Sequence, residues 1–400
     1  MERLTATLAT APAADLAVVI VHYHAARELA AATAALRRDL EASGLVAEWR
    51  IVDNGSTPQE REEIASLGLP TIEGGGNRGF AAGVNRGIAT ATAPVFLVLN
   101  PDVEVLPGCA RALLDELERG TGAAAPRLYW DPDRRFLLPV GEERSRRWEI
   151  LALAARYRPA CASRARRRWR RDVRRHWEAA GSLRSLRLSG AILAVPRSVW
   201  MRVGPFDEGY RLYFEETEWL LRLAAAGFEA RQARGAEAVH GFARSTRHEP
   251  EAAAWFTDSA RRFRAARYGR WFVRLCDRLA ALLERRRSIP PPLPRWSEGG
   301  LSGVAAAAPS RGVVWLELSP NVEGFPAAGT RVARADLAAW SPPRELMEAS
   351  GLAGMSLCVT SDGGRELGRW WIDGGPGGAG PPAMREPARD QNRSPSPMAR

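Results

Sequence analysis

Apolar runs and amphipathic stretches alternate along the first part of the chain. The continuous apolar run LAVVIVHY (16–23) predicts a buried strand, and AARELAAATAALRRDLEA after it predicts an amphipathic helix. The alternation continues through EWRIVDNGS, TPQEREEIASLG, LPTIEGGGNRG, FAAGVNRGIATAT and APVFLVLNPD. Strands that alternate with helices predict an α/β fold with a mainly parallel central sheet covered on both faces.

The same pattern returns after residue 188. LSGAILAVP predicts a strand, RSVWMRVG a short helix, and YFEETEWLLRLAAAGF a longer helix followed by FEARQARGAEAVHG. Two further helical stretches cover 249–267 and 270–287. Beyond the proline-rich stretch SIPPPLPRWSEGG, short strand-like pieces such as GVVWLELSP and GMSLCVTSD predict a small β domain.

These patterns divide the chain into consecutive parts. We expect an α/β domain at 1–245 with an arginine-rich insertion at 141–187, a helical extension at 246–287, a Pro/Gly linker at 288–311, a separable small β-rich accessory domain at 312–372 and a disordered tail at 373–400.

Charge is concentrated in the insertion. The chain of 400 residues has a formal net charge of +11, and residues 144–187 alone hold fifteen arginines against three acidic residues. Trp148, Trp169 and Trp177 stand among these arginines, so we expect an irregular segment that binds an anionic membrane surface. A mobile loop over a site and a contact with an acidic protein are the alternatives. Nucleic-acid binding is not expected, because no recognised module is present.

The cysteines do not form a pattern. Cys109, Cys161, Cys276 and Cys358 lie far apart, which predicts neither a disulfide framework nor a thiolate metal site and fits a reducing compartment. The chain has no apolar run of about 18 residues and no signal-peptide pattern at its start. We therefore expect a cytoplasmic protein, peripheral at the inner face of the cell membrane.

Polar residues stand at the carboxyl ends of four predicted strands. They are Asp53 in VDNGS, Asn77 in GGGNRG, Asp102 in LNPDVE and His240 in AEAVHG. Because ligands of parallel α/β sheets bind beyond the carboxyl ends of the strands, these residues mark a candidate site.

The glycine loop has two readings. GGGNRG matches the dinucleotide fingerprint GxGxxG through Gly74, Gly76 and Gly79. The fingerprint belongs to the first strand–helix turn, however, and this is the third, which argues against a nicotinamide-dependent enzyme. The loop is either a tight turn or a nucleotide-contacting loop of another kind.

The other strand-end residues also have structural alternatives. Asp102 suits a hard divalent cation that bridges a diphosphate, or caps the following turn. Asp53 accepts hydrogen bonds from a base or ribose, or closes an Asx-turn. His240 is a structural histidine or a metal ligand.

The stretch LYFEETEWLLR places three glutamates at the start of one helix. Glu218 and Arg222 are partners at i,i+4, and Glu216 lies where the helix dipole favours an acid. Capping does not explain Glu215. A carboxylate held beside aromatic side chains at a helix start is a candidate general base.

Taken in order, these motifs resemble a known family. VIVHYH, IVDNGS, NRGFAAGVNRG, LNPDVE, SGAILAVPRSVWMRVGPFDE, YFEETEWLLRLAAAGF and AVHG are similar to the family 2 inverting glycosyltransferases with a GT-A fold, especially the rhamnosyltransferase-like branch. The resemblance covers about residues 16–245. It does not include 141–187 or the chain after about 290.

The resemblance implies a nucleotide-diphosphate sugar donor, a Mg²⁺ or Mn²⁺ ion and direct attack by an acceptor hydroxyl at the anomeric carbon. It implies that Asp53 contacts the nucleoside. It also implies that the nucleotide loop uses Asn77, Arg78, Gly79 and Asn85.

The same resemblance indicates which residues bind the metal and which residue is the general base. Asp102 fills the metal-binding aspartate of the family, and His240 fills a histidine that reaches the metal in some members. Glu216 fills the general-base position, with Glu215 supporting it. The family usually has aspartate there, so the base side chain is longer by one methylene. His24 in HYH also departs from the family pattern at the nucleotide.

We therefore expect a metal-dependent inverting glycosyltransferase. The donor is expected to be dTDP-rhamnose, or else a UDP-hexose, and the acceptor a hydroxyl of a cell-surface glycan or lipid-linked glycan. The alternative is a non-catalytic scaffold of the same fold that binds a glycan or a sugar nucleotide.

Overall fold

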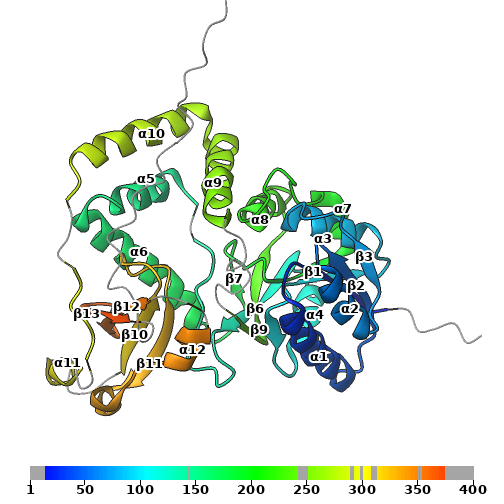
Figure 1. Cartoon of the computed structure of the whole chain (residues 1–400), viewed down its shortest axis with the longest axis horizontal. Helices are drawn as coiled ribbons and strands as arrows, with labels where there is room; N and C mark the ends of the chain where they lie inside the picture. The colour runs from blue at the N-terminus through cyan, green and yellow to red at the C-terminus, as the bar shows by residue number, and fades with distance from the viewer. Residues whose placement is uncertain are drawn as a thin grey trace, which may run out of the picture. The chain divides into compact units, whose positions relative to one another are not determined.

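A computed structural model describes most of the chain (Figure 1). The described residues are 14–142, 144–241, 251–288, 292–297, 301–307, 313–349, 351 and 354–373. They form two compact units that are each assembled from separate pieces of the chain. The first unit comprises 1–148, 169–278 and 328–330, and the second comprises 149–168, 279–327 and 331–400.

A nine-stranded sheet forms the centre of the first unit. Its strands are β1 (Leu16–His22), β2 (Ala47–Asp53), β3 (Thr71–Glu73), β4 (Val95–Leu99), β5 (Val103–Val105), β6 (Ala123–Tyr129), β7 (Leu183–Arg184), β8 (Ile192–Pro196) and β9 (Ala230–His240). Their order is β3-β2-β1-β4-β8-β6-β9-β5, with β7 paired to β9.

The sheet is mixed. Strands β3, β2, β1 and β4 run parallel to one another, and β6 runs parallel to β9. Strand β8 is antiparallel to both β4 and β6, which joins the two parallel parts. The predicted α/β class with a mainly parallel sheet is confirmed, and β8 adds the antiparallel element between its halves.

Helices cover both faces of this sheet (Figure 1). They are α1 (Ala26–Ala42), α2 (Pro58–Ser66), α3 (Phe80–Ala89), α4 (Cys109–Glu118), α7 (Arg197–Val203) and α8 (Glu215–Ala225). Helix α9 (Ala252–Tyr268) lies apart from the sheet and packs on Phe214, before α8. On one face α3, α7 and α8 pack on alternate residues of the strands, such as Val19 and Val21 of β1. On the other face α4 packs against β6, β8 and β9, with α1 beside it.

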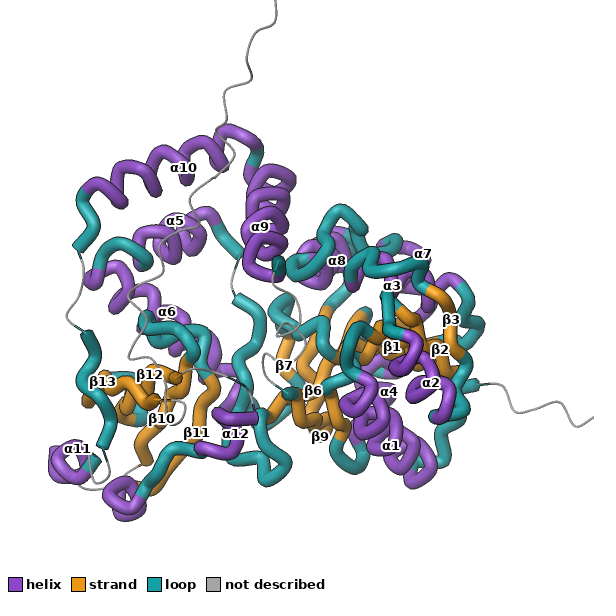
Figure 2. Tube along the Cα trace, in the orientation of Figure 1, coloured by secondary structure: helices purple, strands orange, loops and turns teal. Residues whose placement is uncertain are grey.

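The arginine-rich segment is helical, so the prediction of an irregular segment was wrong. It forms α5 (Arg146–Ala155) and α6 (Pro159–Trp177), which Figure 2 shows as continuous helices. Three arginines of α6, Arg166, Arg170 and Arg174, are buried together with its tryptophans. A periodicity count that treats every arginine as solvent-exposed therefore misses the helix.

Burial also changes the predicted membrane contact. Trp148, Trp169 and Trp177 are all buried, and Trp169 packs edge-to-face on Trp177 at a centroid distance of 6.0 Å. Side chains inside the protein core do not insert among lipids. These tryptophans are therefore core residues, and the expectation that they meet a membrane is corrected.

The second unit contains a four-stranded sheet of order β11-β10-β12-β13. Its elements are β10 (Val313–Ser319), β11 (Ala328–Ala333), the 3-10 helix η1 (Arg334–Ala339), α12 (Arg344–Ala349), β12 (Gly354–Ser361) and β13 (Glu366–Asp373). The predicted C-terminal β structure is confirmed. Within this unit, buried Arg166 of α6 donates to Glu366 Oε2 at 3.0 Å and to the Glu323 carbonyl at 2.8 Å.

The predicted domain boundaries stay a prediction. Residues 149–168 belong to the same compact unit as the C-terminal sheet, and α10 (Arg270–Arg285) begins in one unit and ends in the other. The segment predicted as a linker contains the short helix α11 (Ser302–Ala307), and the N–H of Trp296 donates to the Trp371 carbonyl at 2.7 Å. The predicted disordered tail lies outside the described residues, apart from Asp373.

Candidate active site

The carboxyl ends of β1, β2, β3 and β4 meet at one edge of the sheet. Strand β8 is antiparallel to β4, so its first residues lie at this edge too. The N–H of Asn100, directly after β4, donates to the Ala191 carbonyl before β8 at 2.7 Å. The sheet topology thus brings NPD, SGA and the turn after β2 together, as expected for a ligand site in an α/β fold.

Asp53 closes a tight turn at the end of β2. Its Oδ1 accepts from the N–H groups of Gly55 at 3.0 Å and Ser56 at 2.7 Å, and its Oδ2 accepts from Arg61 Nε at 2.9 Å. Burial opposes ionisation, but the hydrogen bonds from Ser56, Arg61 and Gly55 outweigh it and lower the pKa of Asp53 to about 2. The Asx-turn alternative is therefore realised, and a nucleoside contact by Asp53 stays a prediction.

The glycine loop packs tightly on this turn. A Cβ atom on Gly74 would run into the Asp53 carbonyl oxygen, and Gly79 has a φ of 91° with the Arg211 carbonyl oxygen against it. The side chain of Asn77 accepts from Asn54 Nδ2 at 3.2 Å. Only glycine fits these two positions, so the loop shape is dictated by close backbone approach.

The other two predicted residues of the nucleotide loop differ in exposure. Arg78 is exposed to solvent after the glycines. The amide of Asn85 donates to the Phe206 carbonyl at 2.9 Å and to Glu208 Oε1 at 3.0 Å, and its Oδ1 accepts from the Phe206 N–H. Asn85 therefore braces the loop between α7 and α8, and its nucleotide contact stays a prediction that this geometry does not support.

The two histidines of HYH have structural partners. His22 is fully buried, its Nε2 accepts from the Ala25 N–H at 3.1 Å, and its Nδ1 therefore donates to Ser56 Oγ at 2.8 Å. Burial lowers the pKa of His22, which keeps the ring neutral. His24 Nδ1 lies 3.0 Å from Glu60 Oε2, so this ring points to the start of α2.

Asp102 and His240 lie side by side at the same edge. Strand β5 pairs antiparallel with β9, with Val103 opposite His240, and His240 Nε2 is 3.4 Å from Asp102 Oδ1. Both carboxylate oxygens of Asp102 are buried and have no hydrogen-bond partner among the described residues. Orphaned buried carboxylate oxygens beside an imidazole are the donor set that a divalent cation satisfies.

The protein offers only part of a metal shell here. Within the described residues, no group of three or more His, Cys, Asp or Glu side chains is arranged to hold an ion. A Mg²⁺ ion is typically bound by one or two carboxylates together with substrate phosphates. Asp102 and His240 therefore fit an ion that a diphosphate completes.

Helix α8 begins with a strained backbone. Tyr213 and Phe214 both have positive φ angles, 67° and 75°, which is costly for aromatic residues. The Phe214 ring is held by Phe256 and Phe263 of α9, at centroid distances of 5.5 Å and 5.3 Å. Packing on α9 thus maintains a turn that directs Glu215, the next residue, inward.

Glu215 and Glu216 form an acidic pair in which Glu215 is buried and Glu216 is partly exposed. Burial and then the charge of Glu216 raise the pKa of Glu215 well above its usual value, and burial raises the pKa of Glu216. Glu215 Oε2 has no hydrogen-bond partner among the described residues. A carboxylate whose pKa is raised toward neutrality is suited to accept a proton.

Room for Glu216 comes from Gly190, in the SGA turn before β8. A Cβ atom on Gly190 would stand 3.2 Å from both Cβ and Cγ of Glu216. The same turn binds Asn100 through Ala191. Gly190 therefore places the acidic pair beside the Asp102 turn, a role that the sequence showed only as a glycine in a predicted loop.

Glu218 has a structural role, as predicted. It forms an ion pair with Arg222 at 2.9 Å, and Arg222 also donates to the carbonyls of Val203 and Pro205 at 2.7 Å. This fixes α8 to the end of α7. The next residue, Trp219, stacks on Trp200 of α7 at a centroid distance of 5.4 Å. These two contacts anchor the first two turns of α8 on α7.

Arg144 is a site residue that the sequence did not indicate. Its guanidinium lies over the Phe214 ring at 4.4 Å, and its charge acts on Glu216. It precedes α5 in the segment that no family motif covers. Nothing in its spacing distinguishes it from the other arginines there.

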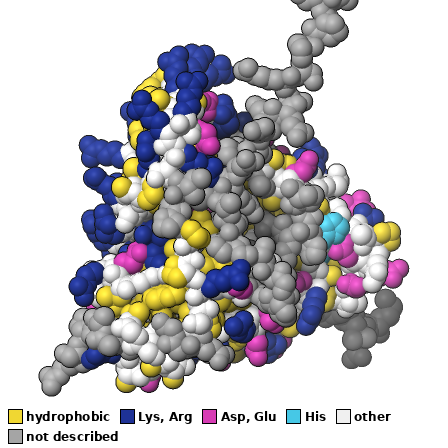
Figure 3. All heavy atoms as spheres, turned by 60° about the vertical axis from the view of Figure 1, so that its left-hand side comes forward, with side chains coloured by type: hydrophobic (Ala, Val, Ile, Leu, Met, Phe, Trp, Pro, Cys, Tyr) yellow, Lys and Arg dark blue, Asp and Glu magenta, His cyan; other side chains and the backbone are white. Residues whose placement is uncertain are grey.

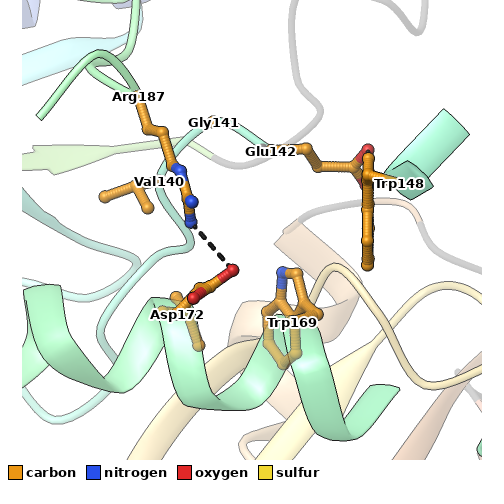
Figure 4. A pocket seen from close by; sticks show the side chains of 8 residues that line it. Val140, Gly141, Glu142, Trp148, Trp169, Asp172 and Arg187 are labelled. Atoms are coloured by element: carbon orange, nitrogen blue, oxygen red, sulfur yellow. Dashed lines mark hydrogen bonds and ion pairs between the residues drawn. The ribbon is translucent and has the colours of Figure 1, made fainter. Parts of the chain in front are cut away.

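The insertion leaves a small cavity of about 10 Å³ next to this region (Figure 4). Trp148 and Trp169 line one side, and Asp172 and Arg187 form an ion pair of 3.2 Å on the other. That volume suits about one water molecule. The cavity is therefore a packing feature and not a binding site for a nucleotide.

Comparisons with known proteins show the family of the chain. The model of glycosyl transferase family 2 matches residues 17–173. The N-acetylglucosaminyl-diphospho-decaprenol L-rhamnosyltransferase of two Mycobacterium tuberculosis strains is 34% identical over 220 residues, which is 50% of this chain and 68% of that protein. The low-salt glycan biosynthesis hexosyltransferase Agl10 of Haloferax volcanii is 24% identical over 236 residues, 56% of this chain and 67% of that protein.

One solved structure is also similar. It is the mannosyltransferase PcManGT from Pyrobaculum calidifontis in complex with GDP-Man and Mn²⁺, with a TM-score of 0.40 and 13% identity over 70% of this chain and 77% of that chain. A TM-score of 0.40 is too low to support a conclusion.

The chain belongs to glycosyltransferase family 2. The match to the rhamnosyltransferase, at 34% identity over 68% of its length, establishes this. The protein is therefore a glycosyltransferase similar to rhamnosyltransferases, and its GT-A fold is the one predicted from the motifs.

Asp53→Asn tests the turn at the end of β2. The folded-state pKa of about 2 lies below the ordinary 3.8, so Asp53 contributes stability above pH 4 that is lost as the pH falls from about 4 to 2. We expect the free energy of unfolding of Asp53→Asn to be about 2 kcal/mol lower than that of wild type at pH 7. This difference should become smaller as the pH is lowered to 3. Urea unfolding at both pH values measures it.

The control for this experiment is Glu62→Gln, an exposed residue of α2. It should change the free energy of unfolding little at either pH. A gap between wild type and Asp53→Asn that is the same at pH 7 and pH 3 would contradict the ionised, hydrogen-bonded Asp53.

Proposed function

We propose that this glycosyltransferase is metal-dependent and inverting, and that it transfers a sugar from a nucleoside-diphosphate donor to a hydroxyl of a lipid-linked glycan. The proposed donor is dTDP-rhamnose, with a UDP-hexose as the second choice. The name of the 34% identical relative describes transfer of L-rhamnose to N-acetylglucosaminyl-diphospho-decaprenol, which supports both the sugar and the kind of acceptor. A lipid-linked acceptor would place the enzyme at the cytoplasmic face of a membrane.

The observation that carries this proposal is the acidic pair Glu215 and Glu216 beside the Asp102 turn. Gly190 packs closely on Glu216, because a Cβ there would stand 3.2 Å from the Glu216 side chain, and the turn that contains Gly190 also holds Asn100, two residues before Asp102. A proton acceptor and a candidate diphosphate-bridging carboxylate thus share one edge of the sheet. Transfer to a hydroxyl needs both.

Under this proposal, each of these residues has a separate role in the reaction. Glu216 accepts the proton of the acceptor hydroxyl as its oxygen forms a bond to the anomeric carbon. The bond between that carbon and the diphosphate oxygen breaks on the opposite side, which inverts the configuration. Asp102 and His240 would hold a Mg²⁺ or Mn²⁺ ion, which when bound supplies positive charge for the leaving diphosphate.

The aromatic side chains at the start of α8 limit the access of water to the acidic pair. Phe214 is buried against α9, and Trp219 is buried beneath the acidic pair. A desolvated carboxylate is a stronger proton acceptor than a hydrated one because burial raises its pKa. The extra methylene of Glu216, compared with the aspartate usual in the family, fills the space above Gly190.

A ligand panel tests donor and metal. Thermal unfolding is measured with dTDP, UDP and GDP, each with and without Mg²⁺ or Mn²⁺. A nucleotide at 100 times its dissociation constant should stabilise the protein by about 2.7 kcal/mol. We expect dTDP with metal to give the largest shift, and Asp102→Asn to lose the part of the shift that depends on metal.

The control in this panel is Glu41→Gln, because Glu41 is an exposed acid in the last turn of α1, which leads into the amino end of β2 at the opposite edge of the sheet. It should behave as wild type. A metal-dependent shift that survives in Asp102→Asn would show that the ion binds elsewhere. Binding of nucleotide without any turnover of dTDP-rhamnose or UDP-hexoses would favour the non-catalytic scaffold.

A glutamine series on α8 tests the base. Glu216→Gln removes the proton acceptor and should lower kcat by about 10²–10⁴, with donor affinity little changed. Glu215→Gln should lower kcat less than Glu216→Gln does, because Glu215 only supports the proposed base. Glu218→Gln is the matched control on the same helix and should lower kcat least, since the ion pair of Glu218 with Arg222 contributes only about a few tenths of a kcal/mol to stability.

Steady-state kinetics with saturating donor measure this series. A kcat for Glu216→Gln close to that of wild type would exclude Glu216 as the base. If Glu218→Gln were instead the most damaging change, the catalytic carboxylate would lie on the other side of α8.

A further inference from the structure

Helix α10 has an apolar stripe that faces solvent. Trp271 is 55% exposed, Leu275 43% and Leu282 52%, whereas Phe272 and Cys276 on the other side are buried. Successive residues of a helix are about 100° apart, so the three exposed side chains lie within an arc of about 40°. Exposed apolar side chains aligned on one face of a helix mark a candidate interaction surface.

Positive charge flanks this stripe. Arg274, Arg278 and Arg285 lie along one edge of it, at the same helical spacing. The acids of the helix, Asp277 and Glu284, lie more than about 120° away from the stripe around the axis, and Asp277 is paired with Arg261 at 2.8 Å. Figure 3 shows arginines with hydrophobic side chains among them in the upper part of the view, where α10 lies.

We propose that the α10 stripe, Trp271, Leu275 and Leu282 with its flanking arginines, docks on the surface of an anionic lipid bilayer. Leucine and tryptophan enter the boundary between headgroups and acyl chains, while long arginine side chains reach the anionic headgroups. This inference rests on the proposed function, because a lipid-linked acceptor is presented at a membrane. Among the described residues no helix is suited to cross a bilayer, so contact along a helix face is the form that this structure offers.

Charge and shape together favour lipid over a protein partner. The stripe is narrow and single-sided, and the charge beside it has one sign only, which matches a surface that is uniformly negative. A tryptophan at one end is typical of residues that sit at a membrane interface. The arginine-rich helix α6 offers an alternative, because Arg164, Arg167, Arg171 and Arg175 are exposed along one of its faces without exposed tryptophan.

Flotation of the full chain with vesicles tests this proposal. The vesicles are phosphatidylcholine with or without phosphatidylglycerol, at low and high salt. We expect wild type to float with the anionic vesicles and less so at high salt. Trp271→Ser, Leu275→Ser and Leu282→Ser combined should weaken partitioning about tenfold or more, and Arg274→Gln, Arg278→Gln and Arg285→Gln combined should weaken it and flatten the salt dependence.

The matched control replaces the four exposed arginines of α6 by glutamine and should keep most of the binding. No flotation of wild type, or loss of flotation in the α6 variant but not in the α10 variants, would overturn the proposal. So would a stripe variant that changes only the oligomeric state. Nucleotide-induced thermal shifts of the same proteins separate a failure of docking from a failure of the proposed function.

Discussion

A buried carboxyl group next to a second, partly exposed one resists ionisation, and Glu215 beside Glu216 is such a group. Glu215 and Glu216 stand at the start of α8, after two aromatic residues with positive φ angles. Packing of Phe214 on α9, stacking of Trp219 on Trp200, and the bonds of Arg222 to the end of α7 hold that start in place. Stability elsewhere thus sustains local strain and unfavourable charge at the site.

Much of this arrangement could be predicted from the sequence. Buried strands such as LAVVIVHY have a clear apolar pattern, and polar residues after them reach one edge because parallel strands end together. Strand β6 was not predicted, because AAAPRLY has three alanines and a proline where a strand usually has large apolar residues. Asn85 shows a further limit, since a polar residue in a family motif can serve the fold through a backbone 121 positions away.

Arginine explains the largest difference between prediction and structure. Helix α6 buries Arg166, Arg170 and Arg174 at spacings of four residues, so its inner face looks polar in the sequence. Such side chains bury their aliphatic stems and find acceptors for their charged ends, as Arg166 does with Glu366 and the Glu323 carbonyl. In a chain whose basic residues are arginines, charge counts alone do not separate core from surface. The same property hid Arg144 among its neighbours.

The carbonyl of Arg211 joins the glycine loop to the start of α8. It accepts from the N–H of Phe80 at 3.1 Å, Gly79 packs directly against it, and only three residues separate Arg211 from Glu215. Under the proposed function, a displacement of the glycine loop by a bound donor would be transmitted along this short, strained stretch of backbone to Glu216. Donor binding would then align the proposed base, so the sugar nucleotide would bind first and the acceptor second.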